Sequence, residues 1–405
     1  MPEVSFDGGT FLLEDVQENP ARYVRRLERA RISPGFAECL CQPDRKPRQL
    51  VIRRYGSLLH LAGWPDDGHN HSRKCGFHKD PDTARAGKGG DTTAAIISTA
   101  AGLNAKLDVA LTQRETQSGS RGSPAKSGQR SGRRSASLLA FLQTLWMTAG
   151  LNRWHGVTNV RHWGVCNAQI LAEIADAVIN GNSAQKVLHV IRRYQEAERA
   201  EINAEFGSFL SGLSDRKRGI VIGEINEVET TQYGKALSLR QSAKKYYTTS
   251  ALIDHAATTY PHAWRALGDR AARVIAILLI ERTAKGHLRI VDLAAMLCSA
   301  TFIPCDSIHE VAMANRLVAE SRSFDKPVRM ADEDDMLPDF VLHDTDPQTH
   351  IEVYGMNGVA SYEERKEKKR APRRQRSIPA VEWDVNKTKL SAVIFPTPVA
   401  TARQA

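Results

Sequence analysis

Two apolar segments near the C-terminal end constrain the fold most, because each carries a carboxylate where burial is expected. The first is PDFVL at 338–342, with Asp339 at its head, and the second is HIEVYG at 350–355, with Glu352 inside it. Short apolar runs separated by a polar turn predict two adjacent strands. A carboxylate inside a buried strand is costly unless it is paired, hydrogen-bonded or metal-bound. Asp339 and Glu352 are therefore candidate Mg²⁺ ligands, since Mg²⁺ prefers oxygen ligands and usually takes only one or two carboxylates.

The surrounding sequence predicts the order helix, three strands, helix, strand. Ser307 is the expected N-cap of a helix that carries Glu310, and KPVRM at 326–330 is the expected first strand. A charged helix at 361–371 and a strand at 377–385 complete the order. Glu310 also fits the S-x-x-E capping box, so helix capping alone would explain it.

This order, with P-D on one strand and E-x-x on the next, resembles the PD-(D/E)XK nuclease superfamily. The resemblance implies that Asp339 and Glu352 bind Mg²⁺, with Glu310 as a further acid from the leading helix. A Lys usually follows the Glu by two residues, whereas this chain has Tyr354. Some relatives take that cation from the following helix, which makes Lys366 and Lys369 the candidates here.

Two functions follow from this resemblance. One is metal-dependent phosphodiester hydrolysis, in which the metal lowers the pKa of a bound water and offsets charge on the phosphate. The other is a DNA-binding protein that kept the nuclease fold and lost catalysis, which Tyr354 favours. A third interpretation is a protein-interaction adaptor whose positive charge is incidental.

A second group of candidate ligands lies near the N-terminus. Zn²⁺ takes four nitrogen or sulfur ligands in a tetrahedron, and its binding can fold a module that lacks a large core. We expect a structural zinc module at 36–80 that resembles a zinc knuckle. The preferred ligands are Cys39, Cys41, His71 and Cys75, with His78 competing for the fourth position. The alternative is that these residues bind no metal, because the spacing matches no standard finger.

The chain as a whole also resembles an uncharacterised family of bacterial proteins carried by plasmids and integrative elements. The motifs are CxC…HxxxC, LNRWH, VIGEINE and FDKPVR…LPDFVL…IEVYGM…YEERKEKK. This resemblance implies a role in transfer or maintenance of a mobile element, without implying an activity.

The fold class predicted for the 405 residues is α+β with several domains. We expect an N-terminal region at 1–113, a disordered basic linker at 114–136, a mainly helical middle at 137–300 and a restriction-endonuclease-like αβββαβ core at 301–396. Helices are predicted from Leu138 to near Gly150, at 165–179 and at 250–283, with a strand at 216–228. The first two helices and their basic, aromatic connection could also form a helix-turn-helix DNA reader.

The net charge of +10 indicates a polyanionic partner, with nucleic acid, DNA first, ahead of a membrane surface. A helix is expected after Asn19-Pro20, with Arg22, Arg25, Arg26 and Arg29 on its polar face. The sequence has no apolar run long enough to span a bilayer and no signal peptide pattern. The six cysteines are too few for a disulfide scaffold, so we expect reduced thiols and a cytoplasmic location.

Overall fold

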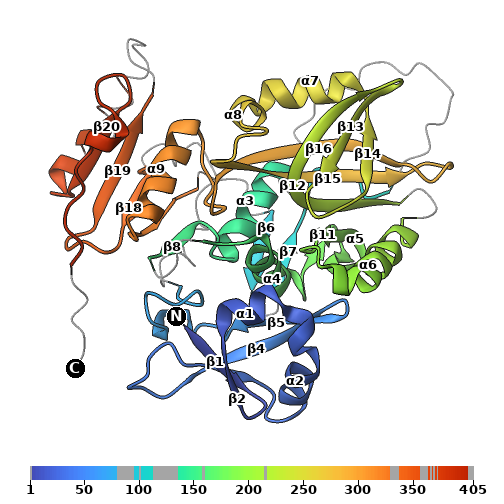
Figure 1. The fold of residues 1–405 in the computed structure, drawn as a ribbon, viewed down its shortest axis with the longest axis horizontal. Coiled ribbons are helices and arrows are strands. Elements are labelled where there is room, and N and C mark those ends of the chain that lie inside the picture. The colour runs from blue at the N-terminus through green and yellow to red at the C-terminus, as the bar shows by residue number, and fades with distance from the viewer. Residues whose placement is uncertain are drawn as a thin grey trace, which may run out of the picture.

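A computed structural model describes residues 2–79, 95–99, 102–112, 136–156, 160–213, 217–328, 337–355 and 373–399, together with 364, 367, 370 and 371. The described chain is mixed α/β and contains four sheets (Figure 1). The predicted linker at 114–136 falls almost entirely outside these residues. None of the described helices combines the length and apolar character that a bilayer span requires.

The N-terminal region is built on an antiparallel five-stranded sheet. Its strands are β1 (Glu3–Phe6), β2 (Gly9–Leu12), β3 (Ala37–Cys39), β4 (Arg48–Tyr55) and β5 (Leu58–Gly63), in the order β2-β1-β3-β4-β5. The helices α1 (Leu13–Glu18) and α2 (Pro20–Ile32) follow β2, and Pro20 begins α2 as predicted. Leu27 of α2 belongs to the same buried core as Val4 and Leu50 of the sheet, so the apolar side of α2 is buried and its arginine side faces outward.

The middle region begins with a helical layer and a small sheet. The helices are α3 (Leu138–Thr148), α4 (Trp163–Ile174), α5 (Ala184–Val187) and α6 (Arg199–Ser211). The small sheet has the order β10-β9-β7-β6, made of β6 (Ile96–Thr99), β7 (Gly102–Ala105), β9 (Val178–Ile179) and β10 (Asn182–Ser183). The described single-turn helices are spread over the chain: η1 (Gly68–Asn70) lies in the N-terminal region, η3 (Glu196–Glu198) in the middle and η5 (Leu390–Ala392) near the C-terminal end.

A six-stranded sheet follows, in which five strands close on themselves. Its strands are β11 (Leu188–Val190), β12 (Arg218–Thr231), β13 (Gly234–Leu239), β14 (Lys245–Thr248), β15 (Ala272–Arg282) and β16 (Leu288–Ser299). The order is β11-β12-β13-β14-β16-β15, and β15 pairs back onto β12. The barrel pairs are antiparallel except β14 with β16, which is parallel.

The connections identify the type of barrel. The helices α7 (Ser250–Thr259) and α8 (Pro261–Arg265) lie between the third and fourth barrel strands and pack against β16. The long first strand β12 pairs with β15 along its first half and with β13 along its second, with a register shift between Ile225 and Glu227. A closed five-stranded barrel with a parallel third–fifth pair and a helix before the fourth strand has the topology of the OB-fold.

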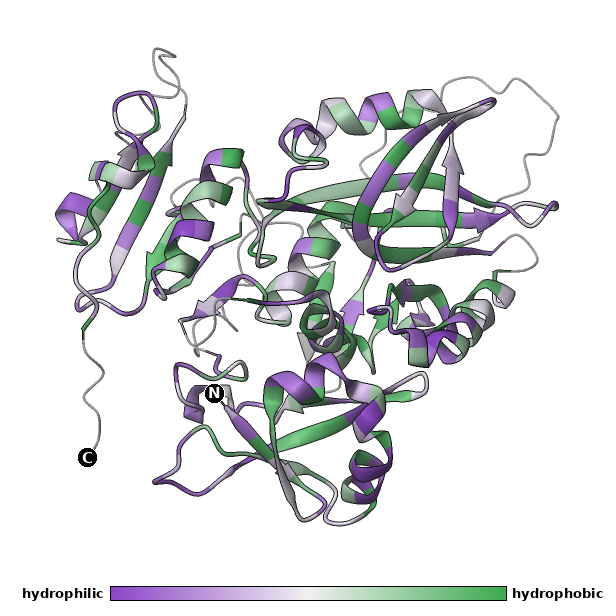
Figure 2. Cartoon of the chain, viewed as in Figure 1, coloured by the Kyte–Doolittle hydropathy of each residue, from purple (hydrophilic) through white to green (hydrophobic). Residues whose placement is uncertain are grey.

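This barrel corrects the prediction of a mainly helical middle region. The predicted helix at 250–283 is two short helices followed by strand β15, and the segment after Gly286 forms strand β16. In β15 alternate side chains enter two different cores, Ile275 and Ile277 on one face, Ala276 and Leu278 on the other. A strand buried on both faces reads as a continuous apolar run without period 2, and periodicity alone cannot tell it from a buried helix. Figure 2 shows the hydrophobic residues gathered in these long strands.

The helix-turn-helix prediction is also wrong. Both helices exist, but α4 is buried along nearly its whole length between α1, β5 and α3, and its first residue Trp163 is 5% exposed. The connection forms strand β8 (Arg153–His155), whose Trp154 is buried. A recognition helix must be exposed to enter a groove, so α4 cannot serve as one.

The C-terminal region contains the predicted elements in the predicted order. Helix α9 (Ile308–Ala319) is followed by β17 (Ser323–Asp325), β18 (Phe340–Leu342) and β19 (Thr349–Tyr354), then helical residues between 364 and 375, then β20 (Ala380–Asp384). The sheet order is β20-β19-β18-β17-β8, with β19 and β20 parallel. The first strand lies just before the expected KPVRM, because Lys326 turns into the interior and Pro327 cannot donate to the ladder.

Candidate functional site

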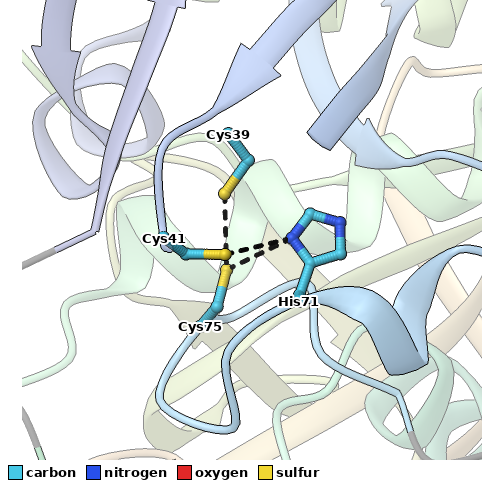
Figure 3. Close-up of side chains that lie close together, drawn as sticks. All are labelled: Cys39, Cys41, His71 and Cys75. Carbon is cyan, nitrogen blue, oxygen red and sulfur yellow. Dashed lines mark hydrogen bonds between the residues drawn. The ribbon is translucent and has the colours of Figure 1, made fainter. Parts of the chain in front are cut away.

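A cluster of three thiols and one imidazole forms where the central strand β3 of the N-terminal sheet ends (Figure 3). Cys39 ends β3, Cys41 follows it, and His71 and Cys75 come from the loop after η1. Their ligand atoms all lie within 4.8 Å of one another. Among the described residues no other group of three or more His, Cys, Asp or Glu side chains meets that distance.

The distances in the thiol cluster fit a tetrahedral metal site. Sγ of Cys39 lies 3.6 Å from Sγ of Cys75, and Nδ1 of His71 lies 3.5 Å from Sγ of Cys41 and 3.7 Å from Sγ of Cys75. Zinc bonds of about 2.3 Å to sulfur and about 2.0 Å to nitrogen place tetrahedral ligands roughly 3.5–3.8 Å apart. The cluster could therefore hold a metal such as zinc.

Backbone groups and mutual proximity support this donor set. The amide of Ser72 donates to Sγ of Cys41 at 3.3 Å, and the amide of Phe77 donates to Sγ of Cys75 at 3.5 Å. The neighbouring thiols Cys39 and Cys75 lower the pKa of Cys41. In turn, Cys39 and Cys41 raise the pKa of Cys75. Without a cation only one of the three thiols is readily ionised, whereas a bound metal would hold all three as thiolates.

The structure brings His71 and not His78 into the thiol cluster. Nδ1 of His78 lies 3.0 Å from the backbone carbonyl of His71, so this ring holds the ligand loop rather than the ligand position. The loop also docks on the middle region, where Nη1 of Arg153 donates to the carbonyl of His78 at 3.1 Å and Nδ1 of His155 lies 3.0 Å from the carbonyl of Arg73. The thiol cluster thus lies where strand β3, the loop after η1 and strand β8 meet.

Asp339 and Glu352 lie side by side on neighbouring strands. The amide of Asp339 donates to the carbonyl of Ile351 at 3.0 Å, and Oδ2 of Asp339 accepts from the amide of Val353 at 2.7 Å. Asp339 is 9% exposed and Glu352 only 1%. This is the arrangement that the two apolar segments predicted.

Glu310 meets a buried lysine rather than these two carboxylates. Its Oε2 lies 2.8 Å from Nζ of Lys326, and it also accepts from the amide of Asp306 at 3.0 Å, next to the Ser307 cap. Burial raises the pKa of Glu310 to about 7; Lys326 opposes this rise, and the carboxylates of Asp306 and Asp339 add to it. Burial opposes the charged form of Lys326, but the carboxylates of Glu310, Asp306 and Asp339 raise the pKa of Lys326 well above its usual value.

Arg373 lies beside Glu352. Its Nη1 lies 3.5 Å from Oε1 of Glu352, and its Nη2 donates to Oε1 of Glu382 at 2.9 Å. The hydroxyl of Tyr354 donates to the same Glu382 oxygen at 3.2 Å. Arg370 also binds Glu382, so this carboxylate is shared by two guanidinium groups. Arg373 therefore provides the positive charge beside Glu352 that a lysine at position 354 would provide. We call Asp306, Glu310, Lys326, Asp339, Glu352 and Arg373 the acidic cluster.

The structure does not assemble the acidic cluster as a preformed metal site. Within the described residues, Glu310, Asp339 and Glu352 do not form a group whose ligand oxygens all lie within 4.8 Å. Lys366 and Lys369, the predicted substitutes for the missing lysine, lie outside the described residues.

Sequence reasoning missed Lys326 and Arg373. Lys326 stands in the FDKPVR motif, where a lysine directly after an apolar strand and before a proline reads as solvent-exposed. Arg373 lies in the basic run from 365 to 376, which reads as a solvated helix face. No local signal separates a buried cation from its exposed neighbours, because the partner carboxylates belong to other elements: Glu310 to α9, and Glu352 and Glu382 to β19 and β20.

The fold and the two clusters define the class of this protein: a mixed α/β protein of several sheets with a Cys₃His cluster that could hold a metal such as zinc. The chain belongs to the DUF1173 family, described as proteins of unknown function, whose model matches residues 13–385. No curated protein and no solved structure matches the chain.

Proposed function

We propose that the chain is a nucleic-acid-binding protein, with DNA as the first partner, acting in transfer or maintenance of a mobile element. In this proposal the C-terminal region is a PD-(D/E)XK-like core that kept its fold and holds its carboxylates with its own cations. The observation that carries the choice against hydrolysis is the pairing of Glu310 with Lys326 and of Glu352 with Arg373.

Internal cations compete directly with Mg²⁺. Lys326 is 3% exposed and Arg373 is 7% exposed, so neither can move into water without opening the core. Removing one partner of a buried ion pair leaves an uncompensated charge, which costs about 3–5 kcal/mol. A metal ion in the acidic cluster would have to offset that cost at each pair. This argument supports a core that binds without cleaving.

The surface supports binding to a polyanion. Helix α2 exposes Arg22, Arg25, Arg26, Arg29 and Arg31. Asp7 pairs with Arg26 and Arg29, and Asp15 with Arg22, which orients three of the guanidinium groups. Five arginines against two aspartates leave three positive charges in excess, and such a row releases counterions when it contacts phosphates.

The thiol cluster has a structural role in this proposal. Zinc held by Cys39, Cys41, His71 and Cys75 would tie strand β3 to the loop that docks on the middle region. All four protein positions are filled, which is typical of structural rather than catalytic zinc.

Hydrolysis is the second candidate, and the charge of the acidic cluster favours it. Asp306, Glu310 and Asp339 surround the single ammonium group of Lys326, and burial with this excess negative charge raises the pKa of Glu310 to about 7. Asp339 and Glu352, with Glu310, would be the residues to hold Mg²⁺, which supplies an activated water and stabilises charge on the phosphate. Arg373 would then stabilise the same charge from the following helix.

The test compares the native chain with Glu352→Gln in Mg²⁺ and Mn²⁺ on plasmid and single-stranded DNA. We expect no cleavage by either protein and DNA binding by both that weakens steeply as salt is raised. Cleavage by the native chain that disappears in Glu352→Gln would replace this proposal with hydrolysis. Absence of nucleic-acid binding at low salt would overturn both.

A further inference from the structure

The five-stranded barrel leaves one outer face uncovered. Its interior is filled by residues such as Leu237, Tyr246 and Leu278, and closed at one end by Ile253 of α7 and Ala263 of α8. The outer sides of β12, β15 and β16 pack on α3 and α4 through a separate core. What remains open is the outer side of β13 and β14 with the adjoining connections 232–233 and 283–287, which we call the β13–β14 face.

Exposed aromatic side chains gather on this face. Tyr233, in the connection between β12 and β13, is 89% exposed, and Tyr247 of β14 is 38% exposed. The ring of His287, in the connection between β15 and β16, lies 5.5 Å from that of Tyr247 in an edge-on arrangement. Strand β14 pairs with both β13 and β16, which places Tyr247 between the two connections. Two exposed tyrosines and a histidine on one face of a barrel suit stacking on flat ligands.

Cations outnumber carboxylates around these rings. The exposed or half-buried cations are Lys235, Lys244, Lys245, Arg282, Lys285 and Arg289, and the carboxylates are Glu227, Glu229 and Glu281. Lys245 is paired with Glu229, and Arg289 with Glu281. Lys244 and Lys285 make no ion pair with described residues, so their charges are available to a ligand.

We infer that the β13–β14 face binds single-stranded nucleic acid, with Tyr233 and Tyr247 stacking on bases and the neighbouring lysines contacting phosphates. Aromatic side chains beside a positive groove bind single strands without sequence preference, because every unpaired base offers a flat face. A duplex hides these faces within its stack. OB-fold barrels bind oligonucleotides on the corresponding strands and loops, but a fold alone does not establish a function, so the inference rests on these side chains.

This inference rests on the proposed function and names its partner class and surface. The experiment uses the full chain and three fluorescein-labelled probes: an oligothymidine strand, an oligouridine strand and a mixed-sequence duplex. Affinities are measured by fluorescence anisotropy for the native chain and for Tyr233→Ala/Tyr247→Ala. We expect the double variant to lose roughly fivefold to 150-fold in affinity for single strands per stacked base, and to bind the duplex as the native chain does.

Two control variants separate stacking from general damage. Trp64→Ala removes a 40% exposed aromatic ring outside the barrel and should bind every probe as the native chain does. Tyr233→Phe/Tyr247→Phe keeps both rings and should retain native affinity for single strands, because the hydroxyl groups are not needed for stacking.

The outcomes distinguish the two proposals. Equal binding of single strands by the native chain and the alanine double variant overturns the inference and leaves the proposed function standing. An equal loss on duplex and single strands also overturns it. A native chain that binds none of the three probes at low salt overturns the proposed function as well. A difference between the oligothymidine and oligouridine losses decides between DNA and RNA.

Discussion

The thiol cluster and the acidic cluster both bury groups that can become negative, but they differ in what offsets that charge. Each gathers groups that become negative when ionised in a buried place, but the thiol cluster has no positive side chain among its members, whereas the acidic cluster contains Lys326 and Arg373. In the thiol cluster the four ligand atoms converge on one point. In the acidic cluster Glu310 pairs with Lys326 and Glu352 with Arg373, so these carboxylates are held by separate cations.

The difference shows how the chain determines whether a buried anionic site needs a metal. Soft thiolates with no internal counterion are stabilised best by an external cation such as Zn²⁺. Carboxylates that already pair with an ammonium or guanidinium group are stabilised much less by binding Mg²⁺. Mg²⁺ also loses its bound waters reluctantly. We therefore expect the N-terminal region to depend on metal and the C-terminal core to be independent of it.

The largest expected effect is at the thiol cluster. Cys75→Ser should reduce bound zinc from one per chain to none, measured by plasma emission spectrometry, and should destabilise the N-terminal region by several kcal/mol. The upper limit is the ~10–16 kcal/mol that structural zinc contributes in zinc-finger peptides. Cys166→Ala is the control, because Cys166 is a buried thiol outside the cluster and its loss should leave the zinc content unchanged. Zinc retained in Cys75→Ser would contradict the proposed ligand set.

The next effect concerns the internal cation of the acidic cluster. Lys326→Met should lower the free energy of unfolding by about 3–5 kcal/mol in urea titrations, because it leaves Glu310 buried beside two other carboxylates. The matched control is Lys387→Met, whose ion pair with Asp384 is 76% exposed on the lysine side and should cost no more than about 1 kcal/mol. If added Mg²⁺ rescued the stability of Lys326→Met, the lysine would be standing in a true metal position.

A pH series sharpens the same comparison. Because the pKa of Glu310 is raised to about 7, the native state binds its proton more tightly than the unfolded chain does. The stabilisation from Glu310 is therefore fully present below its unfolded pKa of 4.5 and is lost as pH rises through 7. Relative to Glu310→Gln, the native chain should lose on the order of 2–3 kcal/mol over this range. The groups facing Glu310 in this series are Lys326, Asp306 and Asp339.

The control for the pH series is Glu320→Gln at the other end of α9. Glu320 is exposed, and among the described residues its one ion pair is with Arg316, one turn earlier in α9. Its replacement should therefore leave the pH dependence of the free energy of unfolding as it is in the native chain. If the free energy of unfolding changed with pH in Glu310→Gln as it does in the native chain, Glu310 would not titrate between pH 4.5 and 7 in the native state.

The smallest effect is at the position of the missing lysine. Tyr354→Phe removes the hydroxyl that donates to Glu382 and accepts from Arg373, and should cost about 0.5–1.5 kcal/mol. Thermal unfolding would measure it. A much larger loss would mean that Tyr354 orients Arg373 toward Glu352, so that the guanidinium group depends on the hydroxyl for its place beside the carboxylate.

The sequence predicted the local features whose signals are short-range. The proline that begins α2, the helix at Leu138, the two strands that carry Asp339 and Glu352, and the CxC…HxxxC ligand set follow from residue patterns, and all of them appear in the structure. Each rests on spacing along a few residues. For this reason a single sequence was enough to find them.

The tertiary structure alone decided three matters: the closure of the barrel, the burial of α4 and the counterions of the acidic cluster. Barrel closure depends on the pairing of β12 with β15, whose partners run from Arg218 with Glu281 to Glu224 with Ile275, far apart in sequence. In addition, a strand buried on both faces gives no period 2. The pairings of Lys326 with Glu310 and of Arg373 with Glu352 depend on which distant elements pack together. Charge and spacing reveal that a carboxylate needs a cation, but only three-dimensional packing determines whether that cation is a metal or a side chain of the same chain.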